Sequence, residues 1–334
     1  MIASDLARAA ILASVPIAAG LHHLVLGQLY VVAFLLGVFT VFFDVGYLAL
    51  LPSLLTRPEL MNGNQLMQAA HSTADLAGPG LGGLLIQVAG AARAVSVDAV
   101  SYLISAAMLL WIRTGDAAPA PREATPMLAE IAEGLRWVFS HPLLRSQLLG
   151  LTLGGFGFFM AIPQVLVFAY GSLRLSPGLV GGLFVLEGAA GLVGLWASPW
   201  VTARLGLGRT MWTTQVGMGV AIMVIPLATL GPPVPVLAAA LLLSGFTALI
   251  QDVNQVTLRQ SLTPLRLQGR MNAIFRLFFW GSWPLASIFG GALASAIGPR
   301  NDILAGGALT IVAALVIALS PIGRIAAHPS HEAG

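Results

Sequence analysis

The sequence contains no cysteine and no lysine, and charged residues make up only 9% of its 334 positions. Without cysteine it can form neither a disulfide bond nor a thiolate nucleophile or metal ligand. It also lacks the HExxH and GxSxG patterns of common zinc and serine hydrolases. Its clustered histidines, His22-His23 and the pair His328 and His331, fall in a short connection and in the tail. We therefore expect neither an enzyme nor a protein that carries a metal or another cofactor.

Apolar residues are abundant instead. They make up 57% of the chain, and the mean hydropathy is +0.88, more than a water-soluble domain of this size could bury. Apolar segments long enough to cross the bilayer occur at roughly residues 3–21, 28–51, 62–88, 94–112, 147–170, 178–199, 210–230, 234–255, 271–295 and 302–320. They lack the strict alternation of barrel strands. The sequence predicts an all-α membrane protein with about ten transmembrane helices, and hence the lipid bilayer as its main partner.

The 16 basic residues, all of them arginines, are distributed unevenly over the connections between these segments. Most fall in alternate connections or in the tail, whereas the opposite connections hold Arg93, Arg174 and Arg300. By the positive-inside rule, the arginine-rich side is cytoplasmic. We expect a multi-pass protein of the cytoplasmic (inner) membrane, with both termini cytoplasmic. No basic and aromatic cluster suited to nucleic acid is evident, and nothing points to a state other than a monomer.

Two stretches of the chain repeat each other at an offset of 208 residues. The pairs are Asp44-Val45 with Asp252-Val253, Leu50 with Leu258, Ser53-Leu54 with Ser261-Leu262, and Gly82-Gly83 with Gly290-Gly291. Such a repeat predicts two pseudo-symmetric lobes, although chance matches of common residues are the alternative. On this reading the first lobe lacks about 60 residues, or two helices, relative to the second.

The longest polar stretch separates the two predicted lobes. We expect an N-terminal lobe of four helices at 1–112, a cytoplasmic linker at 113–145, and a C-terminal lobe of six helices with a short tail at 146–334. Within the linker, Leu128, Ile131, Leu135 and Val138 share one helical face, which indicates an amphipathic helix on the membrane surface. A plain solvated connector is the alternative.

Ionisable residues within the spans indicate either a water-filled cavity or a paired interior, because each charge at mid-membrane costs about 2.5–3.5 kcal/mol. Those inside or near span limits are Asp5, Arg8, Asp44, Asp75, Asp98, Glu187, Asp252 and Arg276. Gln65, Gln68, Ser72 and Asp75 form one polar stripe, with His71 at its edge. We expect Asp5, Arg8, Gln65, Gln68, Ser72, Asp98 and Arg276 to face a cavity or the lobe interface.

Each of these groups also has a structural interpretation. Asp75 and Glu187 are the candidates for proton coupling, with His71 either a third or only a hydrogen-bond partner of Asp75. Asp98 could instead cap its helix or pair with Arg93. A cytoplasmic charge latch would combine Asp44 and Asp252 with the arginines Arg57, Arg259 and Arg270.

The run Gly78-Pro79-Gly80-Leu81-Gly82-Gly83 combines a helix-bending proline with small residues. Proline removes a backbone donor, and glycine lets a neighbouring helix approach closely. The run predicts either a gating helix or passive close packing.

Several of these motifs resemble one family of membrane proteins. Gly78-Pro79 followed by Gly82-Gly83, in a two-lobed helical chain, resembles the antiporter motif of the major facilitator superfamily. Four further pairs of segments resemble the enterobactin-exporter-like branch of this superfamily, also called transmembrane secretion effectors. They are Phe43-Asp44 with Leu50-Leu51-Pro52, Asp98 with Ser101-Tyr102-Leu103-Ile104-Ser105, Gly134-Leu135-Arg136 with His141-Pro142-Leu143-Leu144-Arg145, and Gln260-Ser261-Leu262-Thr263-Pro264 with Gly269-Arg270-Met271. Asp5-Leu6-Ala7-Arg8 resembles the start of the family's third helix. The Gly-Asp-Arg-Arg loop that precedes that helix in the family has no counterpart here.

The resemblance implies a secondary exporter. It would move a small amphipathic molecule, such as a drug or a siderophore, in exchange for protons, with its two lobes rocking around a midplane cavity. Two alternatives remain open: a non-transporting membrane protein derived from such a transporter, for which the missing helices argue, and an importer.

Overall fold

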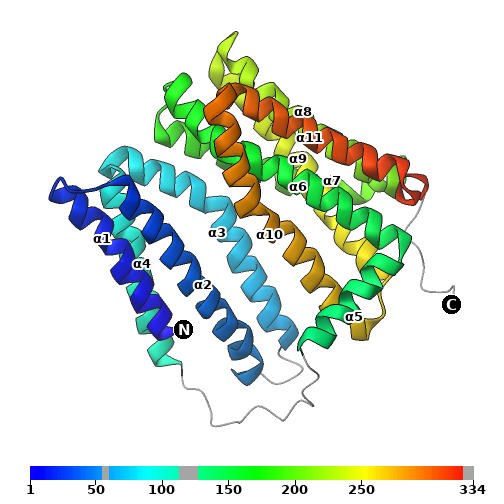
Figure 1. Cartoon of the computed structure of the whole chain (residues 1–334), viewed down its shortest axis with the longest axis horizontal. Coiled ribbons are helices and arrows are strands. Elements are labelled where there is room, and N and C mark those ends of the chain that lie inside the picture. The colour runs from blue at the N-terminus through cyan, green and yellow to red at the C-terminus, as the bar shows by residue number, and fades with distance from the viewer. Residues whose placement is uncertain (55–59, 113–126, 326–334) are drawn as a thin grey trace. The chain divides into compact units, whose positions relative to one another are not determined.

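The computed structural model describes residues 1–54, 60–112 and 127–325, and within these ranges the secondary structure is helical (Figure 1). The chain divides into two compact units. The first comprises Met1–Arg122 with Pro177–Gly182, and the second comprises Glu123–Ser176 with Leu183–Gly334.

Four helices form most of the first unit: α1 (Ile2–Gly20), α2 (Leu26–Leu54), α3 (Leu60–Ala89) and α4 (Ala91–Trp111). Helix α1 packs against both α4 and α2, and α3 contacts α4 (Figure 1). Leu12, Val15, Val32 and Ala99 make the buried core between α1, α2 and α4. The expected four spans of this part of the chain are thus each helical.

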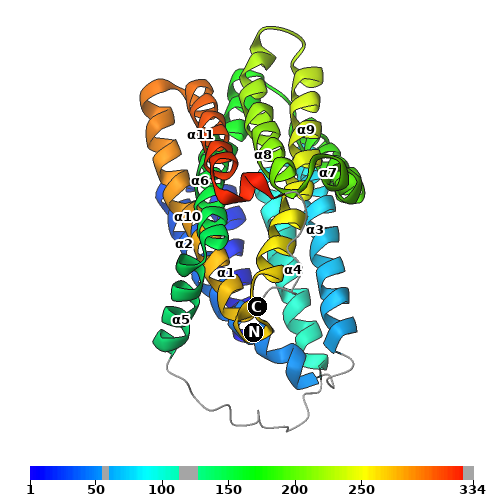
Figure 2. The ribbon, with the colours of Figure 1, turned by 90° about the vertical axis from the view of Figure 1, so that its right-hand side faces the viewer.

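The second unit is built around α6. Its elements are α5 (Met127–Ser140), α6 (Pro142–Val167), a π turn η1 (Phe168–Ser172), the part of α7 (Pro177–Leu205) from Leu183 onward, α8 (Leu207–Val224), a 3-10 turn η2 (Ile225–Thr229), α9 (Pro233–Ser261), α10 (Leu265–Ile297), α11 (Pro299–Leu319) and η3 (Pro321–Arg324). Helix α6 packs against α10 and α11, while α8 packs against α9 and α11. Figure 2 shows α8 and α9 as neighbours joined by a short connection that includes η2.

Local sequence signals fix several of the helix starts. Gly90, Gly206 and Gly298 precede α4, α8 and α11 with φ angles of 84°, 81° and 86°. Only glycine adopts such angles at little cost. Proline stands at the first position of α6, α7, α9 and α11, where its missing N–H would be unpaired in any case. Together these residues separate apolar segments that otherwise merge into one another.

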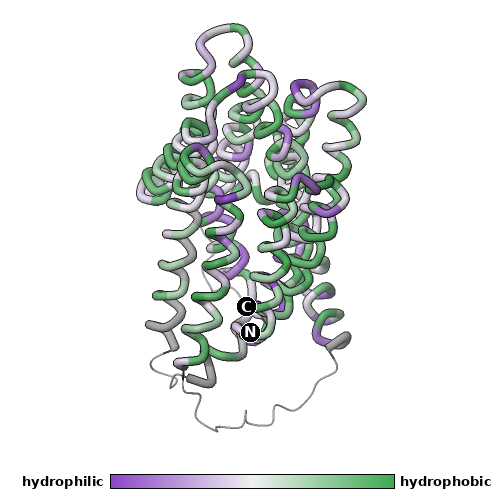
Figure 3. The backbone as a smooth tube through the Cα atoms, turned by 90° about the vertical axis from the view of Figure 1, so that its left-hand side faces the viewer, coloured by the Kyte–Doolittle hydropathy of each residue, from purple (hydrophilic) through white to green (hydrophobic). Residues whose placement is uncertain are grey.

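Nine described helices are long and apolar enough to cross a membrane. Helix α3 is also continuous over 30 residues, and Ala77–Ala89 is its described apolar part. Figure 3 shows mostly apolar helices with short hydrophilic stretches. The predicted fold class, an all-α membrane protein, is confirmed, and the crossing by α3 stays a prediction.

Small residues let the helices of the second unit approach closely. A Cβ atom on Gly157 of α6 would lie 2.5 Å from the carbonyl oxygen of Gly306 on α11, and one on Gly306 would lie 2.6 Å from that of Gly157. The same relation joins Gly219 of α8 to Gly307 of α11. Because lipid chains are as apolar as the helix surfaces, close backbone packing of this kind stabilises a helix pair in a bilayer.

The predicted amphipathic helix in the linker region exists as α5, and it packs against protein. Val138 is fully buried in a cluster with Leu144 and Phe275, and the Leu135 side chain packs against this cluster. Ion pairs join Glu130 and Glu133 of α5 to Arg270, and Glu133 also to Arg266. The helix is therefore an integral part of the second unit, whereas the sequence predicted a separate linker helix on the membrane surface.

Replacing Glu133 by glutamine is expected to lower the free energy of unfolding by only about 0.5–1 kcal/mol, because ion pairs of exposed groups are weak. Glu133 is 39% exposed, and its partners Arg266 and Arg270 are 74% and 27% exposed. The measurement is thermal unfolding in detergent at two salt concentrations. The difference between wild type and variant should shrink at high salt. A large, salt-independent loss would contradict this assignment.

Candidate functional site

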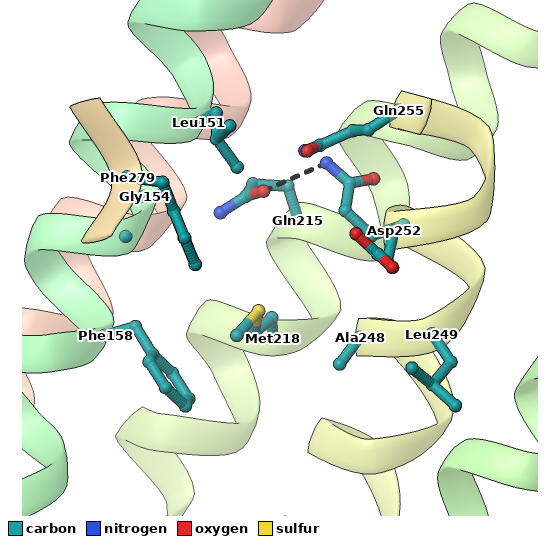
Figure 4. Close-up of a pocket in the computed structure, with 12 residues that line it drawn as sticks. Leu151, Gly154, Phe158, Gln215, Met218, Ala248, Leu249, Asp252, Gln255 and Phe279 are labelled. Atoms are coloured by element: carbon teal, nitrogen blue, oxygen red, sulfur yellow. Dashed lines mark hydrogen bonds between the residues drawn. The ribbon is translucent and has the colours of Figure 1, made fainter. Parts of the chain in front are cut away.

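A cavity of about 220 Å³ lies inside the second unit, among α6, α8, α9 and α10 (Figure 4). Apolar side chains form most of its wall, with Phe158 on α6, Met218 on α8, Leu249 on α9 and Phe279 on α10. The remaining lining residues are Leu151, Gly154, Gly155, Gln215, Ala248, Gln251, Asp252 and Gln255. An apolar pocket with a few convergent polar groups is the usual form of a small-molecule site.

Three glutamine amides on α8 and α9 supply most of the polar part of this wall. Gln251 Nε2 donates to Gln215 Oε1 at 3.0 Å, and the hydroxyl of Thr214 bonds to Gln251 Oε1 at 2.6 Å. Gln147 Nε2 donates to the backbone oxygen of Gln255 at 2.6 Å. All of these side chains are buried. The amides of Gln215 and Gln251 are therefore held in fixed positions by their neighbours.

Asp252 is the carboxylate of the cavity. Its side chain is exposed to the cavity space, and it makes no hydrogen bond or ion pair with another described residue. Figure 4 shows it on the α9 side, with Phe158 and Phe279 on the side of α6 and α10. An open carboxylate facing aromatic rings can accept a positively charged group.

The predicted charge latch is not assembled among the described residues. The guanidinium of Arg259 lies 5.1 Å from the centre of the Phe275 ring; it attracts Asp252 electrostatically but forms no ion pair with it. Arg270 pairs with Glu130 and Glu133 instead. Asp44 is exposed on α2, and Arg57 lies outside the described residues.

Glu187 lies where α7 contacts α9. The hydroxyl of Ser244 donates to Glu187 Oε1 at 2.7 Å, and the Glu187 side chain is half-buried. The two backbones are very close here, because a Cβ atom on Gly245 would lie 1.9 Å from the Glu187 carbonyl oxygen. Ser244 and Asp252 are separated by about 12 Å along α9 at the helical rise per residue. Glu187 therefore contacts α9, the helix that carries Asp252, but it does not line the cavity.

The first unit holds a buried ion pair. Asp5 is 0% exposed and Arg8 is 6% exposed, and the two side chains bond to each other. The hydroxyl of Ser105 donates to Asp5 Oδ2 at 2.7 Å. The Arg8 guanidinium lies between the rings of Phe43 and Tyr102, 4.3 and 4.4 Å from their centres. Asp5 and Arg8, expected at a cavity or lobe interface, instead form a paired interior within α1, α2 and α4.

The other predicted site residues lie on three different helices, α3, α4 and α10. Asp98 and Arg276 are exposed, and the Asp98 backbone oxygen accepts a 2.8 Å bond from Ser101. Gln65, Gln68, His71, Ser72 and Asp75 lie on the continuous helix α3, but their side chains are outside the described residues. Their common stripe stays a prediction.

The glycine run on α3 packs closely against Pro177–Gly182 at Gly80 and Gly83. Helix α3 continues through Pro79, and Gly78 and Gly82 have open space where a Cβ atom would lie. Gly83 is buried, and a Cβ there would lie 2.5 Å from the oxygen of Pro177, which belongs to the same unit. Gly80 comes within contact distance of Gly181. At Gly83 the geometry favours the packing interpretation.

Asp302 is a buried acid that sequence reasoning missed. It is 0% exposed in the first turn of α11, and neither carboxylate oxygen has a partner among the described residues. The available signal was its position two residues after Gly298-Pro299-Arg300, at the start of an apolar span. That position suits a helix cap as well as a buried acid, so the pattern alone did not distinguish it.

The apolar helices, the buried ion pair and the cavity lined with amides define a multi-pass membrane protein of the transporter type. The Major Facilitator Superfamily model matches residues 2–287, and the chain belongs to this family. The resemblance stated from the sequence motifs is thereby confirmed. Members of this family are transporters and not enzymes.

Curated relatives agree with this assignment. The chain is 28% identical over 311 residues to the multidrug efflux pump Tap of Mycolicibacterium fortuitum, covering 90% of this chain and 75% of that protein. It is 28% identical over 272 residues to the enterobactin exporter EntS of Salmonella choleraesuis, covering 79% of this chain and 61% of the relative.

Solved structures share the fold. A bacterial homologue of the iron transporter ferroportin matches in its inward-facing state with a TM-score of 0.65 and 17% identity, over 95% of this chain and 81% of that one. The outward-facing state matches with a TM-score of 0.54 and 20% identity, over 95% and 82% of the two chains.

Proposed function

We propose that this protein is a secondary active transporter that exports a small amphipathic molecule. The observation that carries the proposal is the cavity of the second unit, where apolar and aromatic walls surround three amides and one carboxylate inside a membrane-spanning bundle. A wall of this composition suits a molecule with an apolar body and a few polar groups. The efflux-pump and exporter relatives support the outward direction.

Transport would proceed by alternating access. The ferroportin homologue with the same fold has been solved in inward-facing and outward-facing states. Rocking of two lobes around a central site is the general mechanism of secondary transporters with repeated halves. The sequence repeat at an offset of 208 residues supports two such halves.

The proposed coupling ion is the proton, with Glu187 as its first carrier. Glu187 is half-buried in the bundle, and its side chain bonds to the neutral hydroxyl of Ser244. A change in its charge would therefore alter the energy of the α7–α9 contact and bias one conformation over the other. Asp75, with His71 about one helical turn before it in the sequence, is the second candidate.

The proposed location is the cytoplasmic membrane with both termini inside. The uneven distribution of arginine over alternate connections supports this orientation. Protease access to a tag at either end, in right-side-out and inverted vesicles, would check it.

Glu187→Gln is expected to abolish the dependence of transport on a proton gradient. The test is ethidium movement by the reconstituted protein in vesicles, with and without an imposed gradient. Because glutamine keeps the Ser244 hydrogen bond but has no proton to exchange, ethidium counterflow should remain while gradient-driven accumulation is lost. Glu133→Gln, which removes a carboxylate from α5, is the matched control and should behave as wild type.

Unchanged proton dependence in Glu187→Gln would exclude this residue as the carrier. The same assay separates the alternatives. Absence of ethidium-stimulated proton flux in wild type would favour a non-transporting protein. Gradient-driven movement toward the cytoplasmic side would favour an importer.

A further inference from the structure

We propose that the cavity of the second unit binds organic cations, with Asp252 as the group that accepts the positive charge. This inference rests on the proposed transport function and specifies its substrate class. It reassigns Asp252, which the sequence placed in a cytoplasmic latch, to substrate recognition.

The first argument is charge. Asp252 is the single acidic residue in the sequences of the four helices that line the cavity, α6, α8, α9 and α10. It lines the cavity, exposed and without a hydrogen bond or ion pair to a described residue. A carboxylate inside a membrane protein is costly unless it is paired or hydrated. A cationic ligand would supply the direct partner that Arg259, which attracts Asp252 only from a distance, does not.

The second argument is the chemistry of the surrounding wall. Phe158 and Phe279 place two aromatic rings in the lining, and Met218 and Leu249 add apolar surface. Aromatic faces attract cations and also cover apolar groups. The glutamine amides have no net charge, and those of Gln215 and Gln251 are held by hydrogen bonds, so they add polar contacts without neutralising Asp252. An anionic ligand would meet the carboxylate with no cation in the lining to offset it.

The third argument separates an organic cation from a metal ion. Among the described residues, no group of three or more His, Cys, Asp or Glu side chains could hold a metal. A single carboxylate beside amides and aromatic rings lacks the ligand charge that divalent metals require. A cavity of about 220 Å³ is also far larger than a bare ion and suits an ammonium or phosphonium group with part of its apolar body.

Arg259 is the nearest competitor for Asp252 on the same helix. The two residues are two turns apart on α9, and the Arg259 guanidinium lies against the Phe275 ring. Phe275 belongs to a buried cluster with Val138 and Leu148, and none of these three residues lines the cavity. The charges of Arg259 and Asp252 attract each other, but the two side chains form no ion pair, so the carboxylate stays available for direct contact with a ligand.

The test measures binding of two ions of nearly equal shape and opposite charge, tetraphenylphosphonium and tetraphenylborate. Equilibrium dialysis would use the full chain in lipid nanodiscs, with empty nanodiscs subtracted. We expect wild type to bind the phosphonium ion, and Asp252→Asn to bind it about tenfold more weakly or worse, since a charge-assisted contact is lost. Asp252→Glu should restore binding, and Glu133→Gln should bind as wild type.

Equal binding of the phosphonium ion by wild type and a folded Asp252→Asn would overturn the proposal, and so would tighter binding of the borate. Displacement of the phosphonium ion by micromolar Mn²⁺ would also overturn it, in favour of a metal site. Thermal unfolding of each variant shows that it is folded.

Because binding is measured without transport, a failed vesicle assay with intact phosphonium binding would reject export alone. Intact export with unaltered binding in Asp252→Asn would reject the cation site alone.

Discussion

Replacing Arg8 by methionine is expected to lower the free energy of unfolding by about 3–5 kcal/mol, because it removes one partner of a buried ion pair. Asp5 is 0% exposed and would keep only its bond from Ser105. The contacts of the guanidinium with the rings of Phe43 and Tyr102 would also be lost. The measurement is thermal unfolding of the purified protein in detergent.

A second variant separates loss of charge from loss of packing. Asp5→Asn combined with Arg8→Met leaves no buried charge, and we expect it to recover about half or more of the lost stability. Arg276→Met removes an exposed arginine from α10 and should change stability by less than about 0.5 kcal/mol. If Arg8→Met unfolds at the wild-type temperature, the pair does not stabilise the first unit.

Gly245→Val is expected to separate α7 from α9. Even the first side-chain carbon would lie 1.9 Å from the Glu187 carbonyl oxygen, and this neighbour is backbone that cannot rotate away. Overpacking of this kind costs about 1–3 kcal/mol, and the 2.7 Å bond from Ser244 to Glu187 should break. Because that bond anchors the proposed proton carrier, gradient-driven ethidium transport should fall together with stability.

The absence of cysteine allows a direct measurement of the separation. Spin labels on cysteines introduced at Trp196 of α7 and Leu242 of α9, both exposed, would report a longer distance in Gly245→Val than in wild type. Gly291→Ala on α10 is the control, because no atom lies within 4 Å of a Cβ there. It should be neutral or stabilising by up to about 1 kcal/mol, since alanine favours helix more than glycine. An unchanged label distance in Gly245→Val would contradict the close contact.

The elements of this fold were largely predictable from local sequence. Residue-by-residue hydropathy located the spans, and glycine and proline at residues such as Gly298-Pro299 marked where helices start. Motifs such as Gly78-Pro79 with Gly82-Gly83 pointed to the family that the comparison then showed. These signals are properties of short segments, so they do not depend on what the segments pack against.

The candidate site was only partly predictable. Asp252 and Glu187 could be singled out because a carboxylate within an apolar span is rare. Their surroundings could not be predicted. Glu187 accepts a hydrogen bond from Ser244, which lies 57 positions further along the chain, and four helices contribute side chains to the cavity that Asp252 lines. The sequence placed Arg270 in a latch with Asp252, whereas in the described structure Arg270 pairs with α5.

The sequence by itself determined that the chain crosses the bilayer as helices, where most of those helices begin and end, and which family it belongs to. Only the tertiary structure decided that Asp5 and Arg8 are paired beneath Phe43 and Tyr102, and that α5 docks on α10. The physical reason is that lipid and helix interior are equally apolar, so hydropathy does not reveal which face of a helix meets a neighbour. That choice depends on close packing of small residues and on polar contacts between segments far apart in the chain.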